Sequence, residues 1–443
     1  MNSRRIALLA IVVSVIPFSL HSQAPNTRVA AAFDKFWSAD SPEQAERFTD
    51  DVLKSGVTFD DAYRRLQTGR KYTAQPTGIV KLKNKTKDGV EHFYALNVPS
   101  NYDPSKRYQV RFQLHGGVGG RESNQPRGTG ESPLQAAEQI YVVPYAWNAS
   151  PWWSDDQVLN LAAITDSLKR TYNIDENRVV VAGVSDGGTG AYYIAMRDTT
   201  PYASFLPLNG FIMVLANDDI DDGQIFPNNL RNKPMFVING GKDPLYPTSA
   251  VEPFVKHVST GASVAYHPQP EAGHNTAWWP TVKDTFEKFV TDHPRAPHPD
   301  KLTWETADSS HNRAQWLVID ELGSQPDDAP GLTDLNQMRN PAVTFGANTP
   351  SIRLFSRPKP PGRVDLVRNG NTIQATTRGV AAFTLLLSPD EFDFNQPFRV
   401  TANGRSVFNG RVERSLKTLM KWAARDNDRS MLYAAELKIK LAR

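Results

Sequence analysis

The sequence contains no cysteine among its 443 residues. A disulfide framework and an N-terminus that carries lipid on a cysteine are therefore both excluded. The chain also lacks a strong charge imbalance, because 50 lysines and arginines stand against 47 aspartates and glutamates. We therefore expect neither a nucleic-acid partner nor attraction to an anionic membrane surface. Beyond the first residues no apolar run approaches the length of a membrane span, so stable membrane insertion is not expected.

The N-terminus carries an apolar run, residues 6–20, directly after Arg4 and Arg5. Ser22-Gln23-Ala24 then offers small residues at the two positions that a signal peptidase reads. We therefore predict that residues 1–24 are a signal peptide, cleaved near Ala24. The mature protein is expected to be secreted or periplasmic, in a bacterium, and to fold around cores that need no disulfides.

Changes of pattern divide the remaining chain into three parts. Residues 25–75 contain two helix N-caps, Ser41 and Thr58, each followed by amphipathic spacing. We expect these helices to support the next domain, with a lid over the site as the alternative. Residues 76–296 alternate strands and helices, which is the rhythm of a doubly wound, mostly parallel α/β sheet. Residues 297–443 carry short strand patterns and Asn-Gly turns, which predict a β-sandwich-like accessory domain.

The most informative stretch, residues 179–191, reads as a buried strand, a tight turn and the start of a helix. Its turn spells Gly183-Val184-Ser185-Asp186-Gly187, the G-x-S-x-G pattern of a nucleophile elbow. A serine at such a strained turn needs neighbours with almost no side chain. The pattern predicts Ser185 as a nucleophile and the backbone N–H of Asp186 as one donor to an oxyanion. The Asp186 carboxylate is expected to cap the helix that follows.

A second glycine-rich loop follows the strand pattern at residues 108–114. It begins His115-Gly116-Gly117-Val118, and His-Gly-Gly is the usual sequence motif of the loop that completes an oxyanion hole. The second donor is predicted to be the N–H of Gly117 or that of Val118, and the sequence does not choose between them. His115 itself is expected to be a structural hydrogen-bonding residue.

A serine hydroxyl needs a base to take its proton, and that base needs a carboxylate to hold its tautomer. In this fold the order along the chain is serine, acid, histidine, with the last two on loops after later strands. Asp243 and His274 satisfy this order, so we predict a triad with Ser185. The competing base is His267. The competing acids are Asp218, Asp219, Asp221 and Asp222, which read more simply as a solvated loop or, as a further alternative, as a calcium-like site.

Residues 90–295 resemble the esterase and polyhydroxybutyrate-depolymerase-like branch of the α/β-hydrolase superfamily. The segments that carry the resemblance are Leu114-His115-Gly116-Gly117, residues 172–178 leading into residues 183–188, Gly240-Gly241-Lys242-Asp243, and Gly273-His274. The resemblance implies Ser185 as nucleophile, His274 as base, Asp243 as acid, and no metal or organic cofactor. The chain departs from the family at Asp186, where many relatives carry a small or amide residue. Residues 300–443 also have no counterpart in the minimal enzymes.

Five of the nine tryptophans fall in loops that flank the predicted site. Two interpretations stay open: the rings wall an apolar or aromatic acyl pocket or stack on a sugar, or they pack under long loops. The candidates for substrate contact are Trp147, Trp152, Trp153 and Trp278, and Trp279 is the fifth ring.

These patterns favour an exported serine carboxylic-ester hydrolase that acts on a small-molecule or polymeric ester through an acyl-enzyme intermediate. A serine peptidase of the prolyl-oligopeptidase type is the alternative, because it shares the fold and the triad order, although the chain lacks its long propeller domain. The third hypothesis is a non-catalytic binding protein on the same scaffold, whose turn merely contains a serine. The sequence predicts neither the acyl group nor the oligomeric state.

Overall fold

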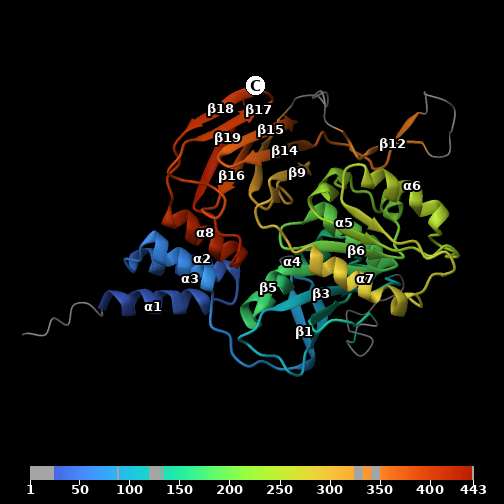
Figure 1. The fold of residues 1–443 in the computed structure, drawn as a ribbon, viewed down its shortest axis with the longest axis horizontal. Helices are drawn as coiled ribbons and strands as arrows, with labels where there is room; N and C mark the ends of the chain where they lie inside the picture. Colours follow the sequence, from blue (N-terminus) through green and yellow to red (C-terminus); the bar gives the residue numbers. More distant parts are fainter. Residues whose placement is uncertain are drawn as a thin grey trace, which may run out of the picture.

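The structure, a computed structural model, describes residues 24–86, 89–118, 131, 134–323, 333–340 and 350–441. The predicted signal peptide lies outside these ranges except for Ala24. Within them, no helix is both long enough and apolar enough to cross a lipid bilayer. The chain forms a helical N-terminal region, a central α/β region and a C-terminal region rich in strands (Figure 1).

An eight-stranded sheet forms the centre of the α/β region, in the order β1-β2-β4-β3-β5-β6-β7-β8. Strand β2 is antiparallel to β1 and β4, and the remaining pairs are parallel, as predicted. The strands are β1 (Gly78–Lys85), β2 (Glu91–Val98), β3 (Tyr108–Leu114), β4 (Ile140–Pro144), β5 (Ile174–Val184), β6 (Ser204–Leu208), β7 (Met235–Val237) and β8 (Val264–Tyr266). The helices are α4 (Asp155–Thr171), α5 (Asp186–Arg197), α6 (Thr248–Ser259) and α7 (Trp279–Asp292), with short 3-10 helices η1 (Ile212–Ala216) and η2 (Pro227–Asn232).

Alternating residues of β5 explain how both faces of this sheet are buried. Val179 and Val181 belong to the core formed with α4, α5 and α6, whereas Val180 and Ala182 belong to the core formed with α7. Successive strand residues point to opposite faces, so a strand covered on both sides reads as a continuous apolar run. Helices on both faces make the sheet doubly wound.

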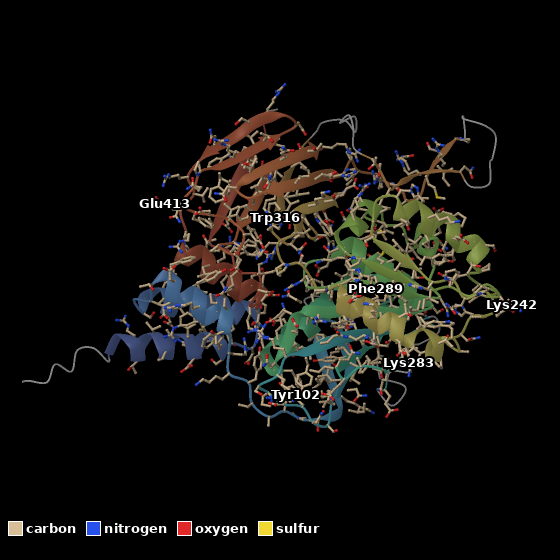
Figure 2. The ribbon with its side chains drawn as sticks, viewed as in Figure 1. Tyr102, Lys242, Lys283, Phe289, Trp316 and Glu413 are labelled. Atoms are coloured by element: carbon tan, nitrogen blue, oxygen red, sulfur yellow. The ribbon has the colours of Figure 1, made fainter. Side chains whose placement is uncertain are left out.

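The C-terminal region contains two sheets that share one core. A four-stranded sheet has the order β10-β11-β16-β19, and a five-stranded sheet has the order β18-β17-β15-β14-β9. Buried side chains from both sheets, such as Trp304 and Phe383, join Trp316 (Figure 2) in one apolar cluster, so the sheets pack face to face. The strands are β9 (Lys301–Thr306), β10 (Arg313–Ala314), β11 (Leu317–Leu322), β14 (Gly362–Asn369), β15 (Thr372–Arg378), β16 (Val380–Leu387), β17 (Phe398–Ala402), β18 (Arg405–Gly410) and β19 (Ala435–Lys440), and β12 (Gln337–Arg339) pairs with β13 (Ser351–Arg353).

The N-terminal helices share their apolar core with the last helix of the chain, and they meet the α/β region through polar contacts, such as that from Arg170 of α4 to the Ala39 carbonyl at 2.8 Å. Phe33 and Val52 share a core with Leu419. The predicted caps form, because the hydroxyls of Ser41 and Thr58 each accept a backbone N–H. The predicted contact with the α/β region is present but polar, and the main apolar partner is α8, because an amphipathic face does not specify which element covers it. The helices are α1 (Ala24–Trp37), α2 (Pro42–Lys54), α3 (Phe59–Thr68) and α8 (Leu416–Asp426).

Residues 294–300 join the α/β and C-terminal regions, and their three prolines predict a linker. The structure has this segment as a connection without helix or strand, as predicted, but it is anchored, because buried Arg295 donates to both carboxylate oxygens of Asp428, at 2.9 and 3.0 Å. Lys169 on α4 lies 3.1 Å from the same carboxylate. Burial alone would raise the pKa of Asp428, but the charges of Arg295 and Lys169 outweigh it and lower the pKa. Buried Arg295 thus joins this connection to the C-terminal region, and Asp428 joins that region to α4.

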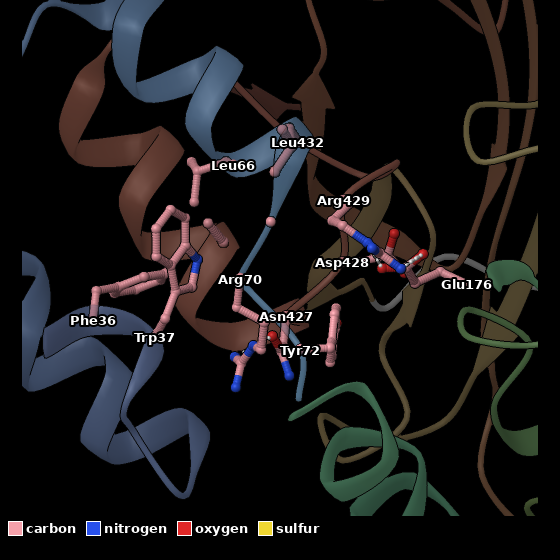
Figure 3. Close-up of a pocket in the computed structure, with 12 residues that line it drawn as sticks. Phe36, Trp37, Leu66, Arg70, Tyr72, Glu176, Asn427, Asp428, Arg429 and Leu432 are labelled. Atoms are coloured by element: carbon pink, nitrogen blue, oxygen red, sulfur yellow. Dashed lines mark hydrogen bonds and ion pairs between the residues drawn. The ribbon is translucent and has the colours of Figure 1, made fainter. Parts of the chain in front are cut away.

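A cavity of about 30 Å³ lies where α1, α3, α8 and the α/β region meet (Figure 3). Trp37 and Leu66 line one side, and Arg70 and Arg429 line another, with Arg429 paired to Glu176. Such a volume holds about two water molecules. The cavity is therefore too small for an organic substrate.

Candidate active site

The chain turns sharply at Ser185, between the end of β5 and the start of α5. Its φ of 57° and ψ of −118° lie outside the regions that residues with side chains usually adopt. A Cβ at Gly183 would come within 2.0 Å of the Gly187 carbonyl oxygen, and a Cβ at Gly187 within 2.2 Å of the Leu114 carbonyl oxygen. A Cβ at Gly116 would lie 2.9 Å from the Cβ of Ser185. The glycine pattern read from the sequence is therefore a steric requirement.

The structure brings the three predicted triad residues together. The Oγ atom of Ser185 lies 2.8 Å from Nε2 of His274, and Nδ1 of that ring lies 2.7 Å from Oδ2 of Asp243. The Asp243 side chain has no exposed surface, whereas that of His274 is 21% exposed. The second oxygen of Asp243 accepts the N–H groups of Leu245 and Tyr246. Because Asp243 is surrounded by donors, the proton of neutral His274 belongs on Nδ1, which leaves Nε2 to accept from the serine.

Backbone hydrogen bonds tie together the loops that carry the acid and the base. The N–H of Lys242 donates to the carbonyl of Ala272 at 2.9 Å. From the neighbouring strand end, buried Asn209 donates its side-chain amide to the carbonyl of Asn275 at 2.8 Å. Asn209 has a positive φ of 47°, a conformation that asparagine tolerates better than most residues. Its Asn-Gly dipeptide at a strand end is the sequence signal that could have identified this support.

The competing candidates have other partners. The His267 ring stacks on a buried phenylalanine of β7, and burial lowers its pKa. Asp222 pairs with Arg197, and Asp221 accepts the N–H of Ser356, so this acidic cluster serves structural contacts. Among the residues that the structure describes, no group of three or more histidines and carboxylates is arranged to hold a metal ion.

The N-terminal helices do not reach this site. Lys242, the neighbour of Asp243, lies on the side of the molecule opposite to α1, α2 and α3 (Figures 1 and 2). The alternative that these helices form a lid over the site is therefore wrong.

The structure distinguishes the two candidate donors of the glycine loop. The N–H of Val118 donates to the Asp186 carboxylate at 2.7 Å, so it is not available to a substrate oxygen. Gly117, with a φ of 66°, keeps its N–H without a hydrogen-bond partner within the described ranges. The expected cap is also wrong, because the Asp186 carboxylate points to the loop and α5 begins without a side-chain cap. The N–H groups of Asp186 and Gly117 remain as the candidate pair of donors.

His115 holds the glycine loop from its strand end. Its Nε2 accepts the N–H of Ala146 at 3.1 Å, which leaves Nδ1 to donate to the Gly116 carbonyl at 2.9 Å. In a trans peptide the carbonyl and the following N–H point in opposite directions. This contact therefore directs the N–H of Gly117 away from His115, and His115 has the structural role predicted for it.

Most of the flanking tryptophans are core residues. Trp152 has no exposed surface, and its indole N–H donates to the His115 carbonyl, which contradicts a substrate contact. Trp147 packs on a buried histidine of β2, and Trp278 is 5% exposed within the core under α7. Both rings are used in packing, which favours the packing interpretation for them. Trp153 is partly buried, and its contact with substrate stays a prediction.

Sequence reasoning missed Tyr246, which lies beside the triad. Its ring meets that of His274 at a steep angle, with centroids 5.7 Å apart. Burial raises the pKa of Tyr246, and the nearby carboxylates of Asp186 and Asp243 raise it further, so the phenol stays neutral. The neighbouring Leu245 is 61% exposed. The available signal was their position directly after the predicted acid.

Comparisons with known proteins identify distant relatives, and no family model matches the chain. The chain is 26% identical over 181 residues to "Probable feruloyl esterase C" of Aspergillus terreus, which covers 38% of this chain and 66% of the relative. It is 27% identical over 157 residues to "Feruloyl esterase C" of Emericella nidulans, covering 33% of this chain and 57% of the relative. The chain thus spans less than two thirds of either relative. The crystal structure of a thermostable esterase is similar with a TM-score of 0.38 and 22% identity, over 49% of this chain and 63% of that one.

Proposed function

We propose that this chain, which resembles the serine esterases of the α/β-hydrolase superfamily, hydrolyses carboxylic esters through an acyl-enzyme intermediate. One observation carries the proposal: the ring nitrogens of His274 lie 2.8 Å from the Ser185 hydroxyl and 2.7 Å from the Asp243 carboxylate. A base within reach of the hydroxyl, itself held by a carboxylate, is the arrangement that activates a serine. The two relatives named feruloyl esterase C support the same class of reaction.

In the proposed reaction Ser185 Oγ attacks the ester carbonyl carbon while Nε2 of His274 takes its proton. The carbonyl oxygen becomes an anion and accepts hydrogen bonds from the N–H groups of Asp186 and Gly117. The bond to the alcohol then breaks, and His274 gives the proton to the leaving alkoxide. Water attacks the acyl-enzyme with the same assistance, which releases the acid and restores the serine. Asp243 stays ionised and stabilises the imidazolium.

We further propose that the substrate lies against an apolar rim beside His274. Tyr246 and exposed Leu245 belong to this rim, and Phe211 meets Tyr246 with ring centroids 6.0 Å apart. Flat aromatic surfaces of this kind suit an apolar or aromatic acyl group. Because both relatives carry the feruloyl name, methyl ferulate belongs beside short p-nitrophenyl esters in the first substrate panel.

The proposal is tested by labelling with a fluorophosphonate probe and mapping the modified peptide by mass spectrometry. We expect the label on Ser185 in the wild-type protein and none in Ser185→Ala or His274→Ala. Ser249→Ala is the matched control, because Ser249 is an exposed serine on α6, and its labelling should equal that of the wild type. A folded wild-type protein that takes up no label would contradict the proposal.

The same protein separates the esterase from the peptidase alternative. We expect turnover of p-nitrophenyl esters to exceed turnover of aminoacyl nitroanilides. The reverse preference, with the label still on Ser185, would favour a peptidase of the prolyl-oligopeptidase type.

We also propose that the protein is exported and loses residues 1–24. Helix α1 begins at Ala24, so this cleavage would leave the described helices nearly complete. N-terminal sequencing of protein from the periplasm or the medium is expected to start at Pro25. Protein that keeps Met1 would contradict the proposal.

A further inference from the structure

We infer that the Asp186 carboxylate is a positioning group for the oxyanion hole, because it fastens the glycine loop to the nucleophile elbow. The inference rests on the proposed function and deepens it. Its basis is the 2.7 Å hydrogen bond from the N–H of Val118 to Oδ2 of Asp186, two residues that are 68 positions apart in the chain.

The loop that carries Gly117 needs such a fastening. Glycine adopts a wider range of backbone conformations than any other residue, and Gly116 and Gly117 stand together here. Among the described residues a Cβ at Gly117 would meet no atom within 4 Å, so packing does not hold that position. The side chain of Val118 is buried in the core, and its hydrogen bond to Asp186 sets the direction of its N–H. His115 fixes the carbonyl of Gly116 on one side. The bond from Val118 to Asp186 fixes the peptide on the other side, and the N–H of Gly117 is held between the two.

Asp186 thereby contributes to both halves of the hole. Its own N–H is the donor beside Ser185, and its carboxylate holds the peptide that follows the second donor, Gly117. Asp186 therefore sets the distance between the two donor N–H groups, its own and that of Gly117. Donors held in advance stabilise the transition state more than donors that must reorient as the charge forms.

The negative charge of Asp186 would itself oppose a nearby oxyanion. Two features moderate this effect: the carboxylate accepts the Val118 N–H, and it lies in the first turn of α5, where the helix dipole favours an anion. An asparagine would keep the acceptor oxygen and remove the charge. Replacement by asparagine therefore separates the hydrogen bond from the charge.

The test measures acylation in the pre-steady state with p-nitrophenyl acetate. In Asp186→Ala we expect the acylation rate constant to fall by about 10- to 100-fold, a part of the roughly 100- to 1000-fold lost with a complete oxyanion donor. The dissociation constant that precedes acylation should change by less than about 3-fold, because the hole acts on the transition state. Asp186→Asn should stay within about 3-fold of the wild-type acylation rate, since its carbonyl still accepts the loop N–H.

A boronic acid inhibitor supplies a second readout. It forms a tetrahedral adduct on the serine, and one oxygen of that adduct occupies the oxyanion hole. In Asp186→Ala its inhibition constant should rise by the same factor by which the acylation rate constant falls. Asp60→Ala, in the first turn of α3, is the control for removal of an acid from a helix start. If Asp186→Ala does not fold, Asp186→Ser replaces it, because its shorter side chain does not span the distance to the loop.

The outcomes are distinct. An Asp186→Ala variant that acylates as fast as the wild type overturns the inference, and so does an Asp186→Asn variant as slow as Asp186→Ala. An unchanged boronate inhibition constant in Asp186→Ala also overturns it. If Ser185→Ala hydrolyses the ester as fast as the wild type, the proposed function itself fails.

Discussion

The indole N–H of Trp152 donates to the backbone carbonyl of His115 at 2.8 Å, and the two rings meet at a steep angle with centroids 5.1 Å apart. A Cβ at Gly190 would lie 2.3 Å from the Cβ of Trp152, so α5 approaches this side chain as closely as a glycine allows. Trp152 therefore braces the strand end from which the glycine loop leaves. It supports the proposed oxyanion hole through His115 and, being fully buried, offers no surface to a substrate.

Trp152→Phe should lower both stability and kcat while KM stays nearly constant. Phenylalanine keeps an aromatic ring but removes the indole N–H that donates to the His115 carbonyl, and the loss of such a hydrogen bond costs about 0.5–1.5 kcal/mol. A looser loop weakens transition-state stabilisation, which lowers kcat more than it raises KM. Denaturant unfolding and kinetics with a short and a long acyl ester measure both effects. A KM that rises only for the long ester would contradict this prediction, because it would mean that Trp152 contacts the acyl chain.

Asp243→Asn should reduce kcat by about 10,000-fold without unfolding the protein. The asparagine carbonyl can still accept the two backbone N–H groups that Asp243 binds, but its NH₂ must face Nδ1 of His274. The imidazole proton then moves to Nε2, which can no longer accept from Ser185. Steady-state kinetics and thermal unfolding check this expectation, with Asp284→Asn on the exposed side of α7 as the control. A variant with wild-type kcat would show that catalysis does not need the Asp243 carboxylate.

The elbow and the triad could be predicted because their signals are local. The glycines at 183 and 187 are required by carbonyl oxygens of the same turn and the adjacent strand. The order of Ser185, Asp243 and His274 follows from where parallel strands end, which the apolar runs of the sequence reveal.

Partners far apart in the chain could not be predicted in this way. The amphipathic faces of α1, α2 and α3 indicate burial, but only the structure shows that α8 covers them. The prolines around Arg295 correctly predict a connection, but not that Arg295 is buried in an ion pair with Asp428, a residue distant in sequence. The choice between Gly117 and Val118 depended on the direction of the Asp186 side chain, which no spacing rule specifies.

Stability should fall as the pH drops from about 6.5 toward 4, because His298 is buried as a neutral ring against Tyr433. Burial lowers the pKa of His298 to about 4, and the charge of Arg295 lowers it as well. In the unfolded chain a histidine binds its proton near pH 6.5. Between these values the unfolded state binds more protons, so the free energy of unfolding rises with pH, by about 3 kcal/mol in total.

His298→Gln should remove this contribution. The packing cost of the substitution is the same at every pH. We therefore compare, at two pH values, the free energy of unfolding of the wild type minus that of the variant. The stability advantage of the wild type over the variant should be smaller at about pH 4.5 than at about pH 7.5, by about 2–3 kcal/mol. Urea unfolding of both proteins at both pH values measures it. An advantage that does not change with pH would mean that His298 binds a proton equally well in the folded protein.

Asp428→Asn should cost about 3–5 kcal/mol of stability, because it leaves two buried cations without their shared counter-charge. Arg295 and Lys169 both contact this carboxylate, and the side chains of Arg295 and Asp428 have no exposed surface. Urea unfolding followed by tryptophan fluorescence measures the loss. The exposed pair of Lys288 and Asp292 is the control, where Asp292→Asn should cost less than about 1 kcal/mol. Equal losses in the two variants would mean that water reaches Asp428 and that its contacts with Arg295 and Lys169 add little to stability.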